Sequence, residues 1–138
     1  MFFKKKIDKQ SNIQLIKIAA LMIHAGKIDE NFSQQEEMII KKALLKMGAN
    51  TENIQEIIEQ SKLIEENANQ ILDFTKEVKN MNEQNKIKIV EALWQIIYSN
   101  KEVDMYEMNL MRRLAGLLYI DHKTMGNIKQ RIIKEFSQ

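Results

Sequence analysis

Few side chains in this 138-residue sequence are suited to catalysis. Cysteine is absent, which excludes cysteine nucleophiles, disulfides and thiolate zinc sites. The two histidines, His24 and His122, lie far apart in the sequence, and neither has an obvious activating partner. His24 falls in the last turn of a predicted helix, where it suits the helix dipole better than a metal. No glycine-rich phosphate loop is present either. We therefore expect no enzymatic activity.

Any functional side chains of this sequence are expected to be positioned by helices. With no proline and only four glycines, the expected fold class is all-α. The strongest pattern lies between Asn85 and Arg113, where apolar residues recur at offsets of three and four, the spacing of one helix face. These residues are Ile87, Val90, Leu93, Trp94 and Ile97. Other apolar residues cover most of the remaining surface, so this helix belongs inside a bundle and Trp94 should be buried.

Capping residues mark where the other helices begin. Capping boxes are predicted at Ser11–Gln14, Ser33–Glu36 and Asp104–Glu107, and single N-caps at Thr51, Asn82 and Asp121. Gly26 is predicted to end the first helix. The polar residues from Asn67 to Asn69 should break the chain into two helices, although one continuous helix from Glu52 to Lys79 is the alternative.

The helix–loop–helix plan occurs twice. A shift of 75 residues aligns Leu15 with Val90 and Ile18 with Leu93, and after a short insertion a shift of 71 aligns Glu36 with Glu107. Two buried helices, each followed by a capped amphipathic helix, predict a pseudo-twofold bundle. We expect an N-terminal tail over residues 1–10 and a single helical domain over residues 11–138.

The charge pattern limits the possible partners. With 21 basic and 19 acidic residues, the net charge of +2 is too even to favour nucleic acid. Residues 52–73 carry six acids and one base, a face that is usually solvated but could meet a basic partner. A short apolar and basic segment could contact an anionic membrane surface, at most weakly. It consists of Phe2, Phe3, Lys4, Lys5 and Lys6. The lack of cysteine suits a reducing cytoplasm, which is the expected location.

The second repeat resembles the tellurite-resistance TerB-like domains. The resemblance covers about residues 13–133 and is strongest between Phe74 and Leu118. It rests on Phe74, Thr75, Trp94, Tyr98, Glu102, Val103, Asp104, Tyr106, Glu107, Arg112 and Arg113. The resemblance implies a compact bundle of about seven helices without established enzymatic activity, tied to stress-response or membrane-proximal complexes.

The same resemblance implies a divalent cation in some members, held by acidic loops. The candidate ligands here are Asp29, Glu30 and Glu36 in the first repeat and Glu102, Asp104 and Glu107 in the second. Hard cations prefer six or more oxygen ligands, and neither loop has the alternating spacing of a calcium-binding loop. Lys27 and Lys101 also bring positive charge to these loops. Helix capping therefore explains these acids better than metal binding does.

Two functions from different classes remain. The leading hypothesis is a non-catalytic interaction module whose protein partner uses either the acidic face or the cavity between the two repeat loops. The alternative is a divalent-metal sensor that uses the loop acids. A co-chaperone role would need a J-domain, which the proline-free sequence cannot contain, because that domain requires a His-Pro-Asp motif.

Overall fold

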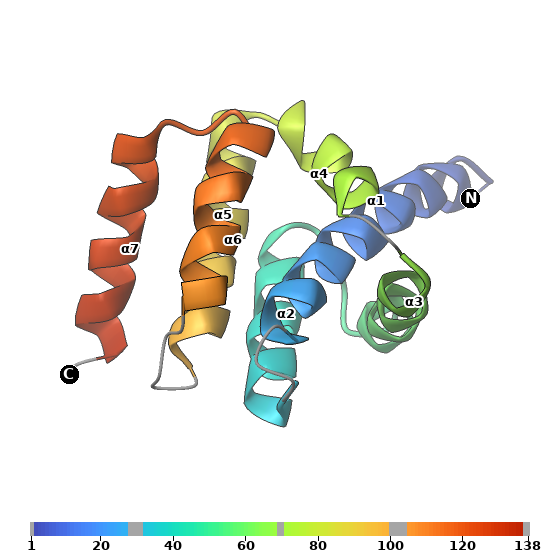
Figure 1. Ribbon diagram of the computed structural model, residues 1–138. Coiled ribbons are helices and arrows are strands. Elements are labelled where there is room, and N and C mark those ends of the chain that lie inside the picture. Colours follow the sequence, from blue (N-terminus) through green and yellow to red (C-terminus); the bar gives the residue numbers. More distant parts are fainter. Residues whose placement is uncertain (1, 28–31, 69–70, 100–104, 137–138) are drawn as a thin grey trace.

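The chain folds as a set of α-helices packed around two buried ones (Figure 1). The computed structural model describes residues 2–27, 32–68, 71–99 and 105–136, with side chains from Asn12 onward. The helices are α1 (Phe2–Lys27), α2 (Gln34–Lys46), α3 (Ile54–Asn67), α4 (Leu72–Lys79), α5 (Glu83–Tyr98), α6 (Met105–Leu117) and α7 (His122–Phe136). The described residues include no strand, and the predicted all-α bundle of about seven helices is confirmed.

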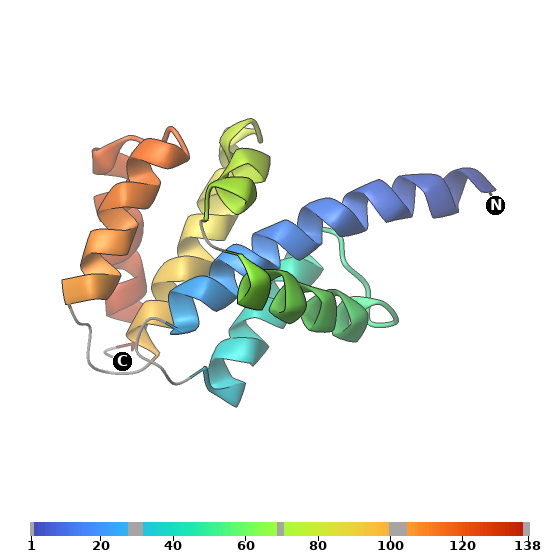
Figure 2. The ribbon, with the colours of Figure 1, turned by 45° about the vertical axis from the view of Figure 1, so that its right-hand side comes forward.

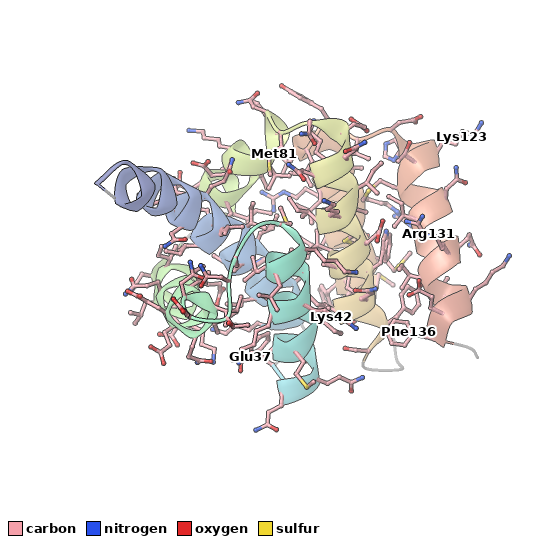
Figure 3. The ribbon with its side chains drawn as sticks, turned by 180° about the vertical axis from the view of Figure 1, so that it is seen from behind. Glu37, Lys42, Met81, Lys123, Arg131 and Phe136 are labelled. Carbon is pink, nitrogen blue, oxygen red and sulfur yellow. The ribbon has the colours of Figure 1, made fainter. Side chains whose placement is uncertain are left out.

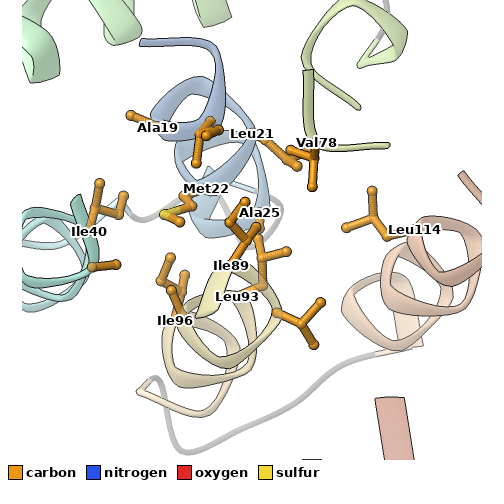
Figure 4. Packing of buried hydrophobic residues seen from close by; sticks show 14 of the residues in the cluster. Ala19, Leu21, Met22, Ala25, Ile40, Val78, Ile89, Leu93, Ile96 and Leu114 are labelled. Carbon is orange, nitrogen blue, oxygen red and sulfur yellow. The ribbon is translucent and has the colours of Figure 1, made fainter. Parts of the chain in front are cut away.

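Helices α1 and α5 form the centre of the bundle. Helix α1 packs against α2, α3, α4 and α5, while α5 also packs against α2 and α7. Figure 4 shows Met22 and Ala25 of α1 on the side of Ile89 and Leu93 of α5, while Leu21 lies towards Val78 of α4. Eight residues of α5 are buried, among them Trp94, whose side chain is only 3 % exposed. The periodicity of residues 87–97 therefore predicted this buried helix correctly.

Helix α1 begins earlier than the sequence indicated. The residues from Phe2 to Asn12 are helical and continue without a break into the buried part of the helix. The predicted capping box at Ser11 is therefore wrong, because Ser11 lies inside the helix and not at its start. Figure 2 shows the first turns of α1 projecting beyond the other helices. None of the described helices has the length and hydrophobicity needed to cross a membrane.

Three of the other predicted caps are confirmed by their hydrogen bonds. Ser33 and Glu36 form both halves of a capping box at the start of α2. The Asn82 side chain accepts a hydrogen bond from the Asn85 amide at 2.9 Å. The Asp121 side chain accepts one from the Lys123 amide at 3.1 Å. In each case the side chain satisfies an amide that the helix itself leaves without a partner.

The start of α3 differs from the prediction. Thr51 lies in a turn, and the side chain that satisfies amides here is that of Asn50: its Oδ1 accepts from Glu52 N and Asn53 N. Asparagine competes well for this role because its amide oxygen reaches the backbone two and three residues on. Helix α3 then ends at Asn67, so residues 52–79 form two helices, as the polar residues near Asn67 predicted.

The two predicted repeats correspond to α1–α2 and α5–α6. Each begins with a buried helix and continues with a helix that buries one face. Glu36 and Glu107, which the repeat aligns, are both buried in the first turn of the second helix. Buried glutamate is uncommon, so finding it at matching positions supports a duplicated helix–loop–helix.

Candidate functional site

The acids proposed as metal ligands fall into two groups. Four of them lie outside the described residues: Asp29, Glu30, Glu102 and Asp104. The other two, Glu36 and Glu107, are described and almost completely buried, with exposures of 0 % and 1 %. Within the described ranges no three or more histidine, aspartate or glutamate side chains are placed to hold a metal ion. Metal binding by the loop acids therefore stays the alternative to helix capping.

Glu36 has the capping role that its spacing from Ser33 predicted, and it also contacts α1. Its Oε1 accepts a hydrogen bond from the Ser33 amide at 2.9 Å, and its own amide donates to the Ser33 hydroxyl at 3.2 Å. Its Oε2 lies against the last turn of α1, where a Cβ on Gly26 would come within 2.6 Å of it. Gly26 does not stop the helix, which continues to Lys27. Its role is to let α1 pack closely against Glu36 and Phe32.

Ion pairs fix the end of α3 to α1. Lys27 Nζ lies 2.7 Å from Glu65 Oε1, and His24 Nδ1 lies 3.4 Å from Glu65 Oε2. His24 therefore faces a carboxylate from another helix in addition to the end of its own. Glu65 belongs to the acidic face predicted for residues 52–73. Because its carboxylate already contacts Lys27 and His24, it is less available to a basic partner.

A second ion pair connects α2 with α3. Lys62 Nζ lies 2.6 Å from Glu37 Oε1, and Lys41 Nζ lies 3.6 Å from Glu37 Oε2. The hydrogen bond from Lys62, helped by the charges of both lysines, lowers the pKa of the Glu37 carboxyl below its usual value, although partial burial opposes this shift. The Glu37 side chain is 22 % exposed, so these contacts are screened by water only in part.

A groove lies between the end of α1 and the first turns of α6. It has a volume of about 440 Å³ and is lined by His24, Tyr106, Asn109, Leu110 and Arg113. Leu110 is buried, whereas Tyr106 at the same site is 74 % exposed. The neighbouring Met105 is 76 % exposed. We call this feature the α1–α6 groove. Residues 28–31 and 100–104, the two repeat loops, follow α1 and precede α6 but are not among the described residues.

Another hollow lies where α3 ends and α4 begins. Its volume is about 350 Å³, and it is lined by Lys17, Leu63, Ile64, Asn67, Ala68, Asp73 and Phe74. Leu63 is 54 % exposed, but Lys17, the base that lines this hollow, is already paired with Glu77 at 3.1 Å. This hollow is the part of the predicted acidic face that combines exposed apolar side chains with an acid, Asp73.

The predicted membrane-contact residues belong to the projecting start of α1. The backbone of Phe2, Phe3, Lys4, Lys5 and Lys6 is helical, while their side chains are outside the described part of the chain. A contact between these residues and a membrane surface stays a prediction.

The structure is thus an all-α domain of duplicated helix–loop–helix plan, with a buried tryptophan on α5 and a buried glutamate in each second helix. The family model described as "Tellurite resistance protein TerB" matches residues 15–130, which is most of the chain, so the protein belongs to the TerB family. Among curated proteins and solved structures, none matches the chain.

Proposed function

We propose that this TerB-family chain is a non-catalytic interaction module that binds a protein partner through the α1–α6 groove. The observation that carries the proposal is the 74 % exposure of Tyr106, which lines the groove; Met105, the residue before it at the start of α6, is 76 % exposed. Tyrosine, methionine and arginine are enriched in the central parts of protein interfaces. Tyr106 and Arg113 both line the groove, so a partner can contact an aromatic ring and a guanidinium together.

The charges around the groove favour an acidic partner. Arg112 and Arg113 are exposed on α6, and neither has a carboxylate within 4.0 Å in the part of the chain that the structure describes. Glu107, the acid of the same helix, is buried. A guanidinium binds a carboxylate through two parallel hydrogen bonds, which fixes the orientation of the bound group. The proposed partner is therefore an acidic segment that also carries one large apolar side chain.

Within this proposal the apolar side chain of the partner packs on Tyr106 and Leu110, while a neighbouring carboxylate reaches Arg113. The name of the family associates it with tellurite resistance. A cytoplasmic location and a role in a stress response are part of the same proposal. They rest on the sequence and on the family name.

The test uses a displayed library of acidic peptides, each containing one tryptophan, phenylalanine or leucine, followed by calorimetry on the selected sequences. Tyr106→Ala and Arg113→Ala should each weaken binding about tenfold, the effect of losing one central contact. Both side chains are exposed, so melting temperatures should stay close to that of the unmodified protein. Leu63→Ala, which changes the other hollow, is the matched control and should leave the affinity unchanged.

Two results would refute this proposal. One is the absence of any binder in a library that covers the stated chemistry. The other is a set of binders whose affinity does not respond to Tyr106→Ala or Arg113→Ala. If only Leu63→Ala reduced the affinity, the partner would bind in the hollow between α3 and α4 and not in the α1–α6 groove.

A further inference from the structure

Tyr119 has an unusual backbone conformation. Among the described residues other than glycine it alone has a positive φ, 56°. It follows α6 in a turn in which Ile120 N donates to Ala115 O at 2.9 Å and Tyr119 N donates to Gly116 O at 3.3 Å. Glycine is the usual residue at this position of such a helix-ending turn, because a side chain is strained there. The Tyr119 ring is 68 % exposed, so burial does little to offset the strain. Strain of this kind often marks a functional site.

Two lysines lie over the same ring. Lys79 Nζ is 5.3 Å from the centroid of the Tyr119 ring, and Lys86 Nζ is 6.0 Å from it. Lys79 is the last residue of α4 and Lys86 belongs to the first turn of α5, so three segments of the chain meet here. Lys86 is only 6 % exposed, which is rare for lysine unless its charge is compensated.

No carboxylate compensates these two charges within the residues that the structure describes. Neither Lys79 nor Lys86 takes part in any ion pair formed there. An ammonium group has three N–H donors, and an aromatic face does not satisfy all of them. Glu83 lies one turn before Lys86 but not within 4.0 Å of its ammonium group, and Asp121 receives the Lys123 amide. The pair of ammonium groups therefore retains the capacity to bind an anion.

We propose that Lys79, Lys86 and Tyr119 form a binding site for a phosphate group, either free phosphate or a phosphate monoester. Such a group carries up to two negative charges, which match two ammonium groups better than the single charge of a carboxylate does. The ring already lies beside both ammonium groups in the ligand-free chain, so the site is organised before the ligand arrives.

This site is separate from the α1–α6 groove. Tyr106 lies in the first turn of α6, whereas Tyr119 follows its last turn. Figure 3 shows Met81, which follows α4, and Lys123, at the start of α7, at the same end of the bundle. The phosphate site therefore does not depend on the proposed protein partner, and each can fail without the other.

The experiment is an NMR titration of the full chain with inorganic phosphate at constant ionic strength. The amides of residues 79, 86 and 119 should shift and saturate. Lys79→Gln should weaken binding about tenfold, the effect of losing one charged hydrogen bond. Lys123→Gln removes the same charge from the same end of the bundle and should leave the affinity unchanged. Lys86 is buried, so a change there could disturb folding, and Tyr119→Gly is the second test. It should raise the melting temperature by relieving strain while weakening phosphate binding.

Vesicles containing phosphatidic acid form a parallel arm that separates a lipid headgroup from free phosphate. If Lys79→Gln reduces binding to free phosphate or to the vesicles, the site is supported, and the ligand whose binding falls is the one that the site takes. Shifts that grow linearly without saturating, or equal weakening by Lys79→Gln and Lys123→Gln, indicate only a general effect of charge and overturn the proposal. An unchanged affinity in Tyr119→Gly would overturn the role of the ring.

Discussion

Replacing Gly26 by alanine should destabilise the protein, although alanine is the better helix former. A Cβ at this position would lie 2.6 Å from Glu36 Oε2 and 2.9 Å from Phe32 Cδ2. Glu36 is fully buried and forms the capping box of α2, so its carboxylate cannot move aside without weakening that cap, which contributes about 1 kcal/mol. Overpacking typically costs about 1–3 kcal/mol, whereas the gain in helix propensity is about 1 kcal/mol. With the weakened cap added to the overpacking and the propensity gain subtracted, we expect a net loss of about 1–3 kcal/mol.

Two other glycines provide matched controls. Gly126 lies inside α7 and Gly116 inside α6, and a Cβ at either position would meet no atom within 4 Å. Alanine at these positions should stabilise the protein by about 0.5–1 kcal/mol through helix propensity. Urea unfolding of the three variants gives the free energies directly. If Gly26→Ala raised the unfolding midpoint as the two controls do, the close packing of α1 on Glu36 and Phe32 would be refuted.

Three further predictions concern single side chains. The Trp94 indole N–H is buried without an acceptor among the described residues, and burying such a donor costs about 1–3 kcal/mol. Trp94→Phe removes this donor, which partly offsets the stability lost with the packing contacts of the indole. It should cost clearly less than Trp94→Ala, about 3–5 kcal/mol, and equal losses in urea unfolding would contradict this. Because the pKa of Glu37 is lowered in the folded state, its ion pair with Lys62 stabilises the protein above the ordinary glutamate pKa and is lost as the pH falls through the lowered value. Lys62→Met should therefore lower the melting temperature at about pH 7 and have little effect near about pH 2, and the same decrease at both values would contradict the ion pair. Asp104 lies outside the described residues and is predicted to be a cap, so Asp104→Ala should cost about 1 kcal/mol and Asp104→Asn little, with no stabilisation by Mg²⁺ or Ca²⁺ in melting curves. A metal-dependent increase confined to the unmodified protein would instead show a ligand.

The interior of the bundle could be predicted because its signal is local. Apolar residues three and four positions apart in residues 87–97 must share a helix face, and α5 buries that face, including Trp94. The same reasoning assigned the caps Ser33, Asn82 and Asp121, since each stands directly before an amphipathic run.

Cap motifs predicted two helix starts incorrectly, at Ser11 and at Thr51. Ser11 with Gln14 has the composition of a capping box, but nothing in the preceding residues breaks a helix, and α1 runs through them from Phe2. A cap motif shows that a helix could begin at a residue, not that it does. At the start of α3, Asn50 and its neighbour Thr51 could both accept from the turn amides. The Asn50 side chain does so, and Thr51 does not.

The candidate sites depend on contacts between residues that are far apart in the sequence, and hydrophobic periodicity does not predict such contacts. Gly26 looks like a helix stop in the sequence, and only the approach of Glu36 and Phe32 shows why a side chain is excluded there. The α1–α6 groove joins His24 to Arg113, and the proposed phosphate site joins Lys79 to Tyr119. Both lie at helix ends, where sequence patterns place boundaries least reliably.

The buried glutamates show why acid spacing alone could not assign a site. Glu36 was named with Asp29 and Glu30 as a possible cation ligand because the TerB-like resemblance implies metal-binding acidic loops, although Ser33–Glu36 also fitted a capping box. In the fold, one Glu36 oxygen accepts the Ser33 amide and the other lies where Gly26 has no side chain. Glu36 therefore links the first turn of α2 to the last turn of α1, and its charge serves the helix start. The repeat places Glu107 at the equivalent position of α6, equally buried. A buried acid in the first turn of the second helix thus recurs in both repeats, and in the first repeat it serves a helix junction and not a metal site.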